Sequence, residues 1–121
     1  MTKYHNQTQY VFENYFSLPN DIFNLGLSAG EISVYSYLMF RENRETYQCY
    51  PSHKTIGKAL KMSANTVRKY VAGLEQKRLI ATDPTKIVTK SGRERNGSLL
   101  YTILPIEDAL RFHFDMRNQA G

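Results

Sequence analysis

Polar side chains of the types that read nucleic-acid bases are gathered in one short stretch of the sequence. Asn65, Thr66, Arg68 and Lys69 follow closely on Ser63. Arginine can pair through two hydrogen bonds with guanine and asparagine with adenine, so Asn65, Thr66 and Arg68 are candidates for contact with base edges. Each also has a plainer role, because Asn65 and Thr66 could solvate a helix start and Arg68 could hold a phosphate. Lys69 is expected on phosphate or in the minor groove.

The distribution of charge along the chain points to the same region. The 121 residues include 16 Lys and Arg against 11 Asp and Glu, a formal net charge of +5. Eleven of the basic residues and only three acidic ones lie between Ser52 and Arg95, whereas the segments on either side are mildly acidic. Such a block is either a solvated face or the binding surface for a polyanion. The elements that carry the block decide between the two.

The basic block is predicted to begin with a short helix. Ser52 is a good N-cap for a helix from about His53 to Lys61. The residues spaced to face inward are Ile56, Ala59 and Leu60. Lys54, Lys58 and Lys61 on this helix are expected to lie over a nucleic-acid backbone, and Ser52 is a further candidate for contact with DNA.

A second helix is predicted after only two intervening residues. Ser63 is again a good N-cap, and the helix should run from Ala64 to about Arg78. Its expected buried stripe is Val67, Val71 and Leu74. In a helix-turn-helix the first helix braces the second, whose N-terminal half can enter a major groove about 12 Å wide. Ser63 and Ala64 are therefore also candidates for contact with DNA.

Beyond Leu79 the hydrophobic period changes from 3.6 to 2, which predicts strands. The expected strands are Leu79–Ala81, Lys86–Thr89 and Leu99–Leu104, with a turn at Asp83-Pro84. Asn96-Gly97 favours the positive φ angles of a hairpin bend, so the loop 90–97 is predicted to be the tip of a β-hairpin. Three cations of this tip, Lys90, Arg93 and Arg95, are expected to reach phosphates or the neighbouring minor groove.

The segments before the basic block are expected to complete a core. Tyr10 to Leu18 is a short strand or an arm, and Pro19 starts a short helix that ends at Asn24. Ser28 and Glu31 form the capping-box pattern of a largely buried helix from Ala29 to Glu42. Residues 47–50 should be extended, because the residue before a proline avoids helical angles.

A last helix is predicted from Pro105 to about Asn118. It carries Phe112, Phe114 and Met116. These side chains are either cover for the core or the seam of a homodimer, and the sequence leaves both interpretations open.

Several classes of function find no support in the sequence. G-x-S-x-G, P-loop and H-E-x-x-H motifs are absent and Cys49 is a lone cysteine, so an enzyme is not expected. His5, His53 and His113 lack metal-ligand spacing, and no cofactor or internal disulfide is expected. No run of about 20 apolar residues and no secretory h-region occurs. The cytoplasm is the expected compartment, without a membrane partner.

The stretch from Tyr50 to Tyr70, continued by Leu74 to Ile80, resembles the winged helix-turn-helix domains of bacterial regulators. It is most similar to helix-turn-helix proteins of Firmicute plasmids and conjugative elements, including the N-terminal domains of replication initiators. The S-x-x-T-V-R core from Ser63 to Arg68 carries this resemblance. The resemblance implies a domain that binds double-stranded DNA, without a cofactor. Such families often have a DNA-contacting arginine where this chain has Ala64, and a turn glycine is usual at the position of Lys61.

The expected fold is mainly α with a small β-hairpin, an α+β winged helix-turn-helix that forms one domain over residues 1–121. The helix-turn-helix should occupy about 52–78, the wing 79–104 and the C-terminal helix 105–118. The expected function is sequence-specific binding of double-stranded DNA by a transcriptional regulator. Two alternatives stay open. One is a DNA-binding domain for replication initiation or maintenance of a plasmid or conjugative element, and the other is a winged-helix module for protein interaction.

Overall fold

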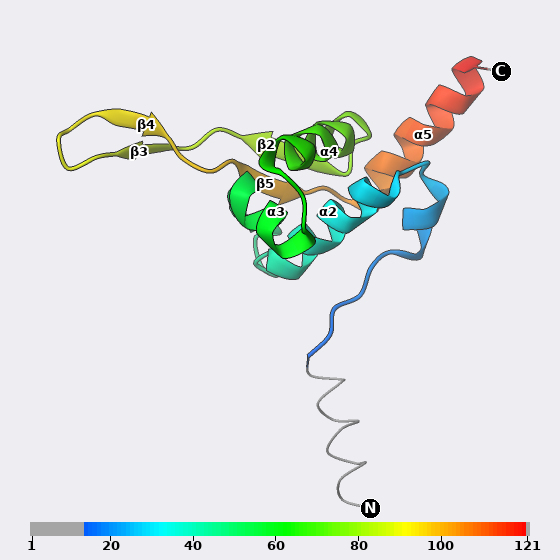
Figure 1. The fold of residues 1–121 in the computed structure, drawn as a ribbon. Coiled ribbons are helices and arrows are strands. Elements are labelled where there is room, and N and C mark those ends of the chain that lie inside the picture. The colour runs from blue at the N-terminus through cyan, green and yellow to red at the C-terminus, as the bar shows by residue number, and fades with distance from the viewer. Residues whose placement is uncertain (1–13, 121) are drawn as a thin grey trace, which may run out of the picture.

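Two capped helices form the centre of the basic block. In the computed structural model, which describes residues 14–120 and their side chains as far as Asn118, α3 spans His53–Leu60 and α4 spans Ala64–Gln76 (Figure 1). The Ser52 hydroxyl accepts a hydrogen bond from the Thr55 N–H at 3.0 Å. The Ser63 hydroxyl accepts one from the Thr66 N–H at 3.1 Å. Both predicted N-caps are confirmed, and α4 ends two residues earlier than expected.

The turn between α3 and α4 depends on two backbone features. Lys61 takes left-handed angles, φ 61° and ψ 43°, and the next amide, of Met62, donates to the Gly57 carbonyl at 2.8 Å. A Cβ atom on Gly57 would overlap the Met62 carbonyl oxygen, so the turn needs glycine there. Gly57 is buried and Ala59 is exposed, so the predicted inward position of Ala59 is wrong.

The α2 helix, Ala29–Arg41, is packed against α4 and carries the predicted capping box. The Glu31 N–H donates to the Ser28 hydroxyl at 3.2 Å, and the Ser28 N–H donates to the Glu31 carboxylate at 2.8 Å. The preceding element is η1, a 3₁₀-helix over Asn20–Asn24. The buried apolar residues of α2 are Val34, Tyr35 and Leu38.

The predicted strand or arm over Tyr10–Leu18 lies partly outside the described residues. From Asn14 to Leu18 the chain forms no strand, and Leu18 packs against the core. The described part is therefore an arm rather than a strand.

The strands form two antiparallel units. β1 (Gln48–Cys49), β5 (Leu100–Ile103) and β2 (Ile80–Asp83) make a three-stranded sheet in the order β1-β5-β2. β3 (Lys86–Val88) and β4 (Glu94–Asn96) make a separate ribbon. The segment after the basic loop therefore pairs with β2 and β1, whereas the prediction placed it opposite Lys86–Thr89.

The bend of the β3–β4 ribbon lies at 89–93, so the predicted bend at Asn96-Gly97 is wrong. Asn96 is the last residue of β4 and is paired with Lys86. The Gly92 N–H donates to the Thr89 carbonyl at 2.9 Å, and Gly92 has the positive φ, 81°. Gly92 and Gly97 could both adopt a positive φ, but the pairing of β3 with β4 places the bend at Gly92.

The core draws apolar side chains from the helices and the three-stranded sheet, and none from the ribbon. The buried residues are Ile22, Leu25, Val34, Tyr35, Leu38, Cys49, Ile56, Val67, Val71, Leu74, Leu79, Ile80, Tyr101 and Ala109. Cys49 is the small buried residue expected for an isolated cysteine, and burial raises the pKa of its thiol to about 11. Among residues 14–120, no helix is long and apolar enough to cross a membrane.

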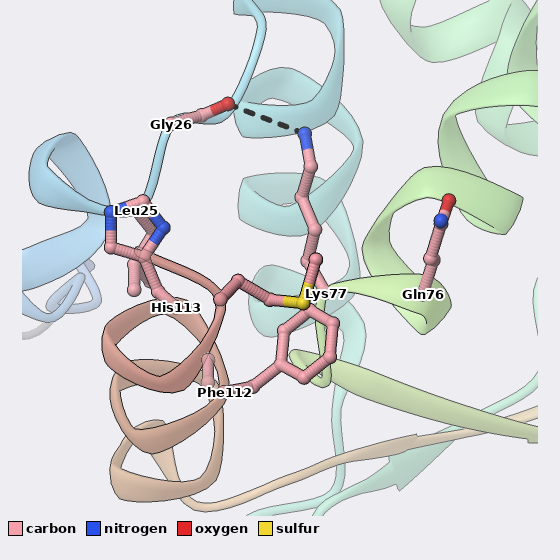
Figure 2. A pocket seen from close by; sticks show the side chains of 8 residues that line it. Leu25, Gly26, Gln76, Lys77, Phe112 and His113 are labelled. Atoms are coloured by element: carbon pink, nitrogen blue, oxygen red, sulfur yellow. Dashed lines mark hydrogen bonds between the residues drawn. The ribbon is translucent and has the colours of Figure 1, made fainter. Parts of the chain in front are cut away.

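The C-terminal helix α5, Ile106–Ala120, lies at the opposite end of the molecule from the ribbon (Figure 1). It buries Ala109 and borders a groove of about 330 Å³ together with Leu25, Gly26 and the end of α4 (Figure 2). Phe112 is half-buried beneath the Arg78 guanidinium, at 5.4 Å from the ring centre. Phe114 and Met116 are 64% and 50% exposed, so neither covers the core.

Candidate nucleic-acid interface

One side of α4 is buried and the other is open to solvent. Val67, Val71 and Leu74 form the buried stripe as predicted. Asn65, Arg68 and Lys69 are all exposed. The polar face of α4 is therefore free to meet a partner along the predicted side.

Two of the three candidate base readers are linked to each other. The Arg68 guanidinium donates to the Asn65 side-chain oxygen at 3.2 Å. The Lys69 ammonium lies over the Tyr70 ring, 5.7 Å from its centre. These contacts hold the Arg68 guanidinium and the Asn65 amide near the start of α4. This is the end of the helix that would enter the major groove.

The side chains at the start of α4 differ in which groups remain available for contact with a partner. The hydroxyls of Ser63 and Thr66 are 2.9 Å apart and share a hydrogen bond, in addition to the cap. Ala64 is exposed and has only a methyl group, which can meet the methyl group of thymine but cannot donate to a phosphate. Ser63 and Thr66 are thus already engaged in holding the helix start, although neither is fully buried.

The start of α3 and the root of the ribbon enclose a pocket of about 550 Å³. Its lining residues are Ser52, His53, Ile87, Asn96, Gly97, Ser98 and Leu99. The Nε2 atom of His53 is buried and has no hydrogen-bond partner among the described residues. Burial, and secondly the charge of Arg68, lower the pKa of His53 below 6.5. The ring is therefore neutral near pH 7 and keeps one unused hydrogen-bonding atom.

The cations of the ribbon are all exposed. Lys90 and Arg93 lie in or beside the bend, and Arg95 lies in β4 opposite Ile87. Because cross-strand partners share a face, Arg95 lies on the face of Ile87, which lines the pocket beside α3. Lys86, which is not among the predicted contacts, adds an exposed cation 3.7 Å from Glu94.

The structure brings some of the predicted site residues together and leaves others apart. At the start of α4 it joins two pairs by side-chain hydrogen bonds, Ser63 with Thr66 and Asn65 with Arg68. The ribbon projects well beyond the helices, so its tip with Lys90 and Arg93 lies away from them (Figure 1). Lys54 is exposed in the first turn of α3, next to the half-buried cap Ser52. Within residues 14–120, no cluster of three or more His, Cys, Asp or Glu could hold a metal.

Comparisons with known proteins place this geometry among known folds. Residues 25–80 match a family model described as a helix-turn-helix domain. The solved structure of a protein titled "Possible transcriptional regulator", from Methanosarcina mazei Go1, is similar with a TM-score of 0.54 and 16% identity, over 80% of this chain and 76% of that chain. The fold is a winged helix-turn-helix. The β3–β4 ribbon is its wing.

Two further results complete the comparison. A crystal structure of an S. aureus MepR–DNA complex is similar with a TM-score of 0.47 and 18% identity, over 98% of this chain and 84% of that chain. No curated protein sequence matches the chain. The predicted fold class is confirmed, whereas the resemblance to proteins of plasmids and conjugative elements stays a prediction.

Proposed function

We propose that this protein binds double-stranded DNA in a sequence-specific manner and acts as a transcriptional regulator. The observation that carries the proposal is the exposed polar face at the start of α4, where Arg68 and Asn65 are joined by a hydrogen bond. Arginine and asparagine are the side chains best suited to guanine and adenine in the major groove. The buried stripe of α4 faces the opposite way, so this face can approach DNA without unfolding the domain.

The cations of the wing and of α3 supply the attraction to the phosphate backbone in this proposal. The residues assigned to DNA contact are Ser52, Lys54, Ser63, Ala64, Asn65, Thr66, Arg68, Lys69, Lys90, Arg93 and Arg95. Asn65, Thr66 and Arg68 read base edges, Ala64 meets a thymine methyl group, and the remaining residues position the protein on the backbone. If about six to eight cations neutralise phosphates, log K should fall with log[salt] at a slope of about −5 to −7.

The proposal includes a homodimer that forms through α5. Phe114 and Met116 are large apolar side chains left exposed on that helix. A helix-turn-helix dimer reads two half-sites about 10 base pairs apart, which gives a longer recognition sequence than one domain can read. A second copy of α5 would cover the apolar face.

Selection of bound sequences from a random duplex pool tests the proposed function. We expect one motif to be enriched, arranged as a palindrome of two half-sites, with affinity that declines steeply as salt is raised. Direct repeats would favour the alternative role in replication initiation. Recovery of no motif, together with salt-independent binding, would contradict DNA recognition and favour a protein-interaction module.

A further inference from the structure

A third concave site lies where α2 meets the segment between β5 and α5. It has a volume of about 350 Å³. Most of its wall is apolar, with Met39, Ile103 and Ile106 among the lining residues. None of its lining residues belongs to the basic block 52–95 or to the surface assigned to DNA. The volume is within the range of pockets that hold small organic molecules, about 300–1,000 Å³.

One charged group in this apolar wall is unsatisfied. The Oε2 atom of Glu42, a lining residue, is buried and has no hydrogen-bond partner among residues 14–120. The ion pairs of the described residues are Lys77–Glu31 and Lys86–Glu94, so no cation is paired with Glu42. Burial raises the pKa of the Glu42 carboxyl, and the charge of Arg44 only partly opposes this. A buried carboxylate without a partner is costly, and in native proteins such an atom calls for an explanation.

Two tyrosines complete the wall around this carboxylate. Tyr35 is almost fully buried, and burial together with the charge of Glu42 raises the pKa of its hydroxyl to about 12. Tyr47 is held at a positive φ of 59° by two backbone bonds, from its N–H to Asn43 at 2.7 Å and from the Ile103 N–H to its carbonyl at 2.9 Å. A non-glycine residue fixed in this strained region is uncommon, and such residues concentrate at ligand sites.

We propose that this pocket binds a small organic cation with an apolar body. The ammonium group would pair with the carboxylate of Glu42, which lines the pocket, and the apolar body would lie against Met39, Ile103 and Ile106. Tyr35 and Tyr47 also line the pocket, and aromatic rings attract cations more than neutral groups. An anionic ligand is disfavoured, because it would bring a second negative charge to the carboxylate.

The pocket connects two parts of the molecule that the DNA proposal uses. Its lining includes the residues that join β5, next to the wing, to α5. A bound cation would therefore contact the base of α5. The proposal itself concerns ligand binding alone and does not depend on whether the protein binds DNA.

Methionine-methyl NMR of the full chain provides the test, with 4-phenylbutylamine and its neutral counterpart 4-phenylbutanol as probes. Met39 lines this pocket and Met116 lines the groove beside α5, so the two methyl groups report on different sites. We expect the amine to shift the Met39 resonance saturably and to leave Met116 unchanged. The alcohol should bind at least about tenfold more weakly, a difference of about 1.4 kcal/mol.

Two matched variants assign the charge preference to one carboxylate. Glu42→Gln keeps the shape of the side chain and should lower affinity for the amine about tenfold, to that of the alcohol. Glu45→Gln removes an exposed carboxylate outside the pocket and should change neither affinity. Equal binding of amine and alcohol, an unchanged Glu42→Gln affinity, or the absence of any Met39 shift would each overturn the proposal.

Discussion

Arg68 and Asn65 give α4 its most selective chemistry, because their linked side chains present two different hydrogen-bonding groups. We predict that Arg68→Ala costs about 1–3 kcal/mol on the preferred duplex and relaxes the preference at one base position. Fluorescence anisotropy on the selected duplex and on a scrambled duplex, at one salt concentration, measures both effects.

The matched control is Arg111→Ala, which removes an exposed cation from α5, at the far end from the wing (Figure 1). It should bind both duplexes like the parent protein. Equal losses of affinity on the two duplexes for Arg68→Ala would assign Arg68 to a phosphate and remove it from base reading.

Glu31 should make the free energy of unfolding of the domain depend on pH. Burial raises the pKa of its carboxyl, but the hydrogen bond from Lys77, the Ser28 N–H and the charge of Lys77 together lower it below 4.5. Because the pKa is lower in the folded state, this stabilisation is complete above the unfolded-state pKa and is lost as pH falls through the folded-state pKa. Glu31→Gln should therefore cost about 1–3 kcal/mol at pH 7, and less at pH 3.

Urea unfolding at pH 7 and pH 3 checks the Glu31 prediction. Glu45→Gln, which alters an exposed loop carboxylate, should leave the free energy of unfolding nearly unchanged at both pH values. The interpretation fails if Glu31→Gln loses the same amount of stability at both.

At the scale of single residues, the helix-capping roles could be predicted from the sequence, but the burial of individual polar side chains could not. Ser52, Ser63 and Ser28 cap their helices because a hydroxyl meets an amide three residues away, an interaction that the sequence contains in full. The burial of His53 and Glu42 arises from segments far along the chain, the wing root and the start of α5. No neighbouring stretch of sequence indicated that His53 Nε2 and Glu42 Oε2 would be buried without a hydrogen-bond partner.

The turn between α3 and α4 offers a test at the level of an element. The left-handed conformation of Lys61 is sterically unfavourable for a residue with a Cβ atom, and glycine would adopt it without this strain. Lys61→Gly should therefore raise the free energy of unfolding by about 0.5–1 kcal/mol. Lys58→Gly, within α3, is the control and should lower it by about 1 kcal/mol. Urea denaturation compares them, and a loss of stability in Lys61→Gly would contradict the strain assigned to this turn.

The wing should act in binding and contribute little to folding. All six residues of β3 and β4 are exposed, and none joins the core. We predict that the combined change of Lys90, Arg93 and Arg95 to Gln alters stability by less than about 0.5 kcal/mol. Affinity should fall for every duplex, and the slope of log K against log[salt] should become shallower by about three.

Salt titration of the wing variant needs a charge-matched comparison. Changing Arg44, Arg111 and Arg117 to Gln removes three exposed cations outside the wing and should leave the salt slope nearly unchanged. Equal slopes for the two triple variants would mean that net charge, and not the wing, attracts DNA.

The helices were predictable within about two residues because their caps and apolar stripes are local. The pairing of the strands could not be predicted from the sequence. Gly92 and Gly97 each fit a bend, and only the pairing of β3 with β4 selects between them. Pairing energy depends on packing against neighbouring strands, which a single stretch of sequence does not contain.

At the scale of the whole molecule, α5 is expected to set the oligomeric state. Light scattering should report a dimer for the parent protein and a monomer for Phe114→Glu, because a charge in an apolar seam is strongly unfavourable. The free energy of unfolding of the monomer should be little changed, since Phe114 is 64% exposed. Phe23→Glu alters another exposed phenylalanine and should remain dimeric. A monomeric parent protein would remove α5 from the proposed function.

Lys77 anchors the end of α4 that is remote from Asn65. Its ammonium group reaches Glu31 at 2.8 Å and the Gly26 carbonyl at 3.3 Å, the contact drawn in Figure 2. These two contacts fasten the last turn of α4 to α2 and to the segment that precedes α2. The direction in which Asn65 and Arg68 project from the molecule is therefore set in part at the opposite end of their helix.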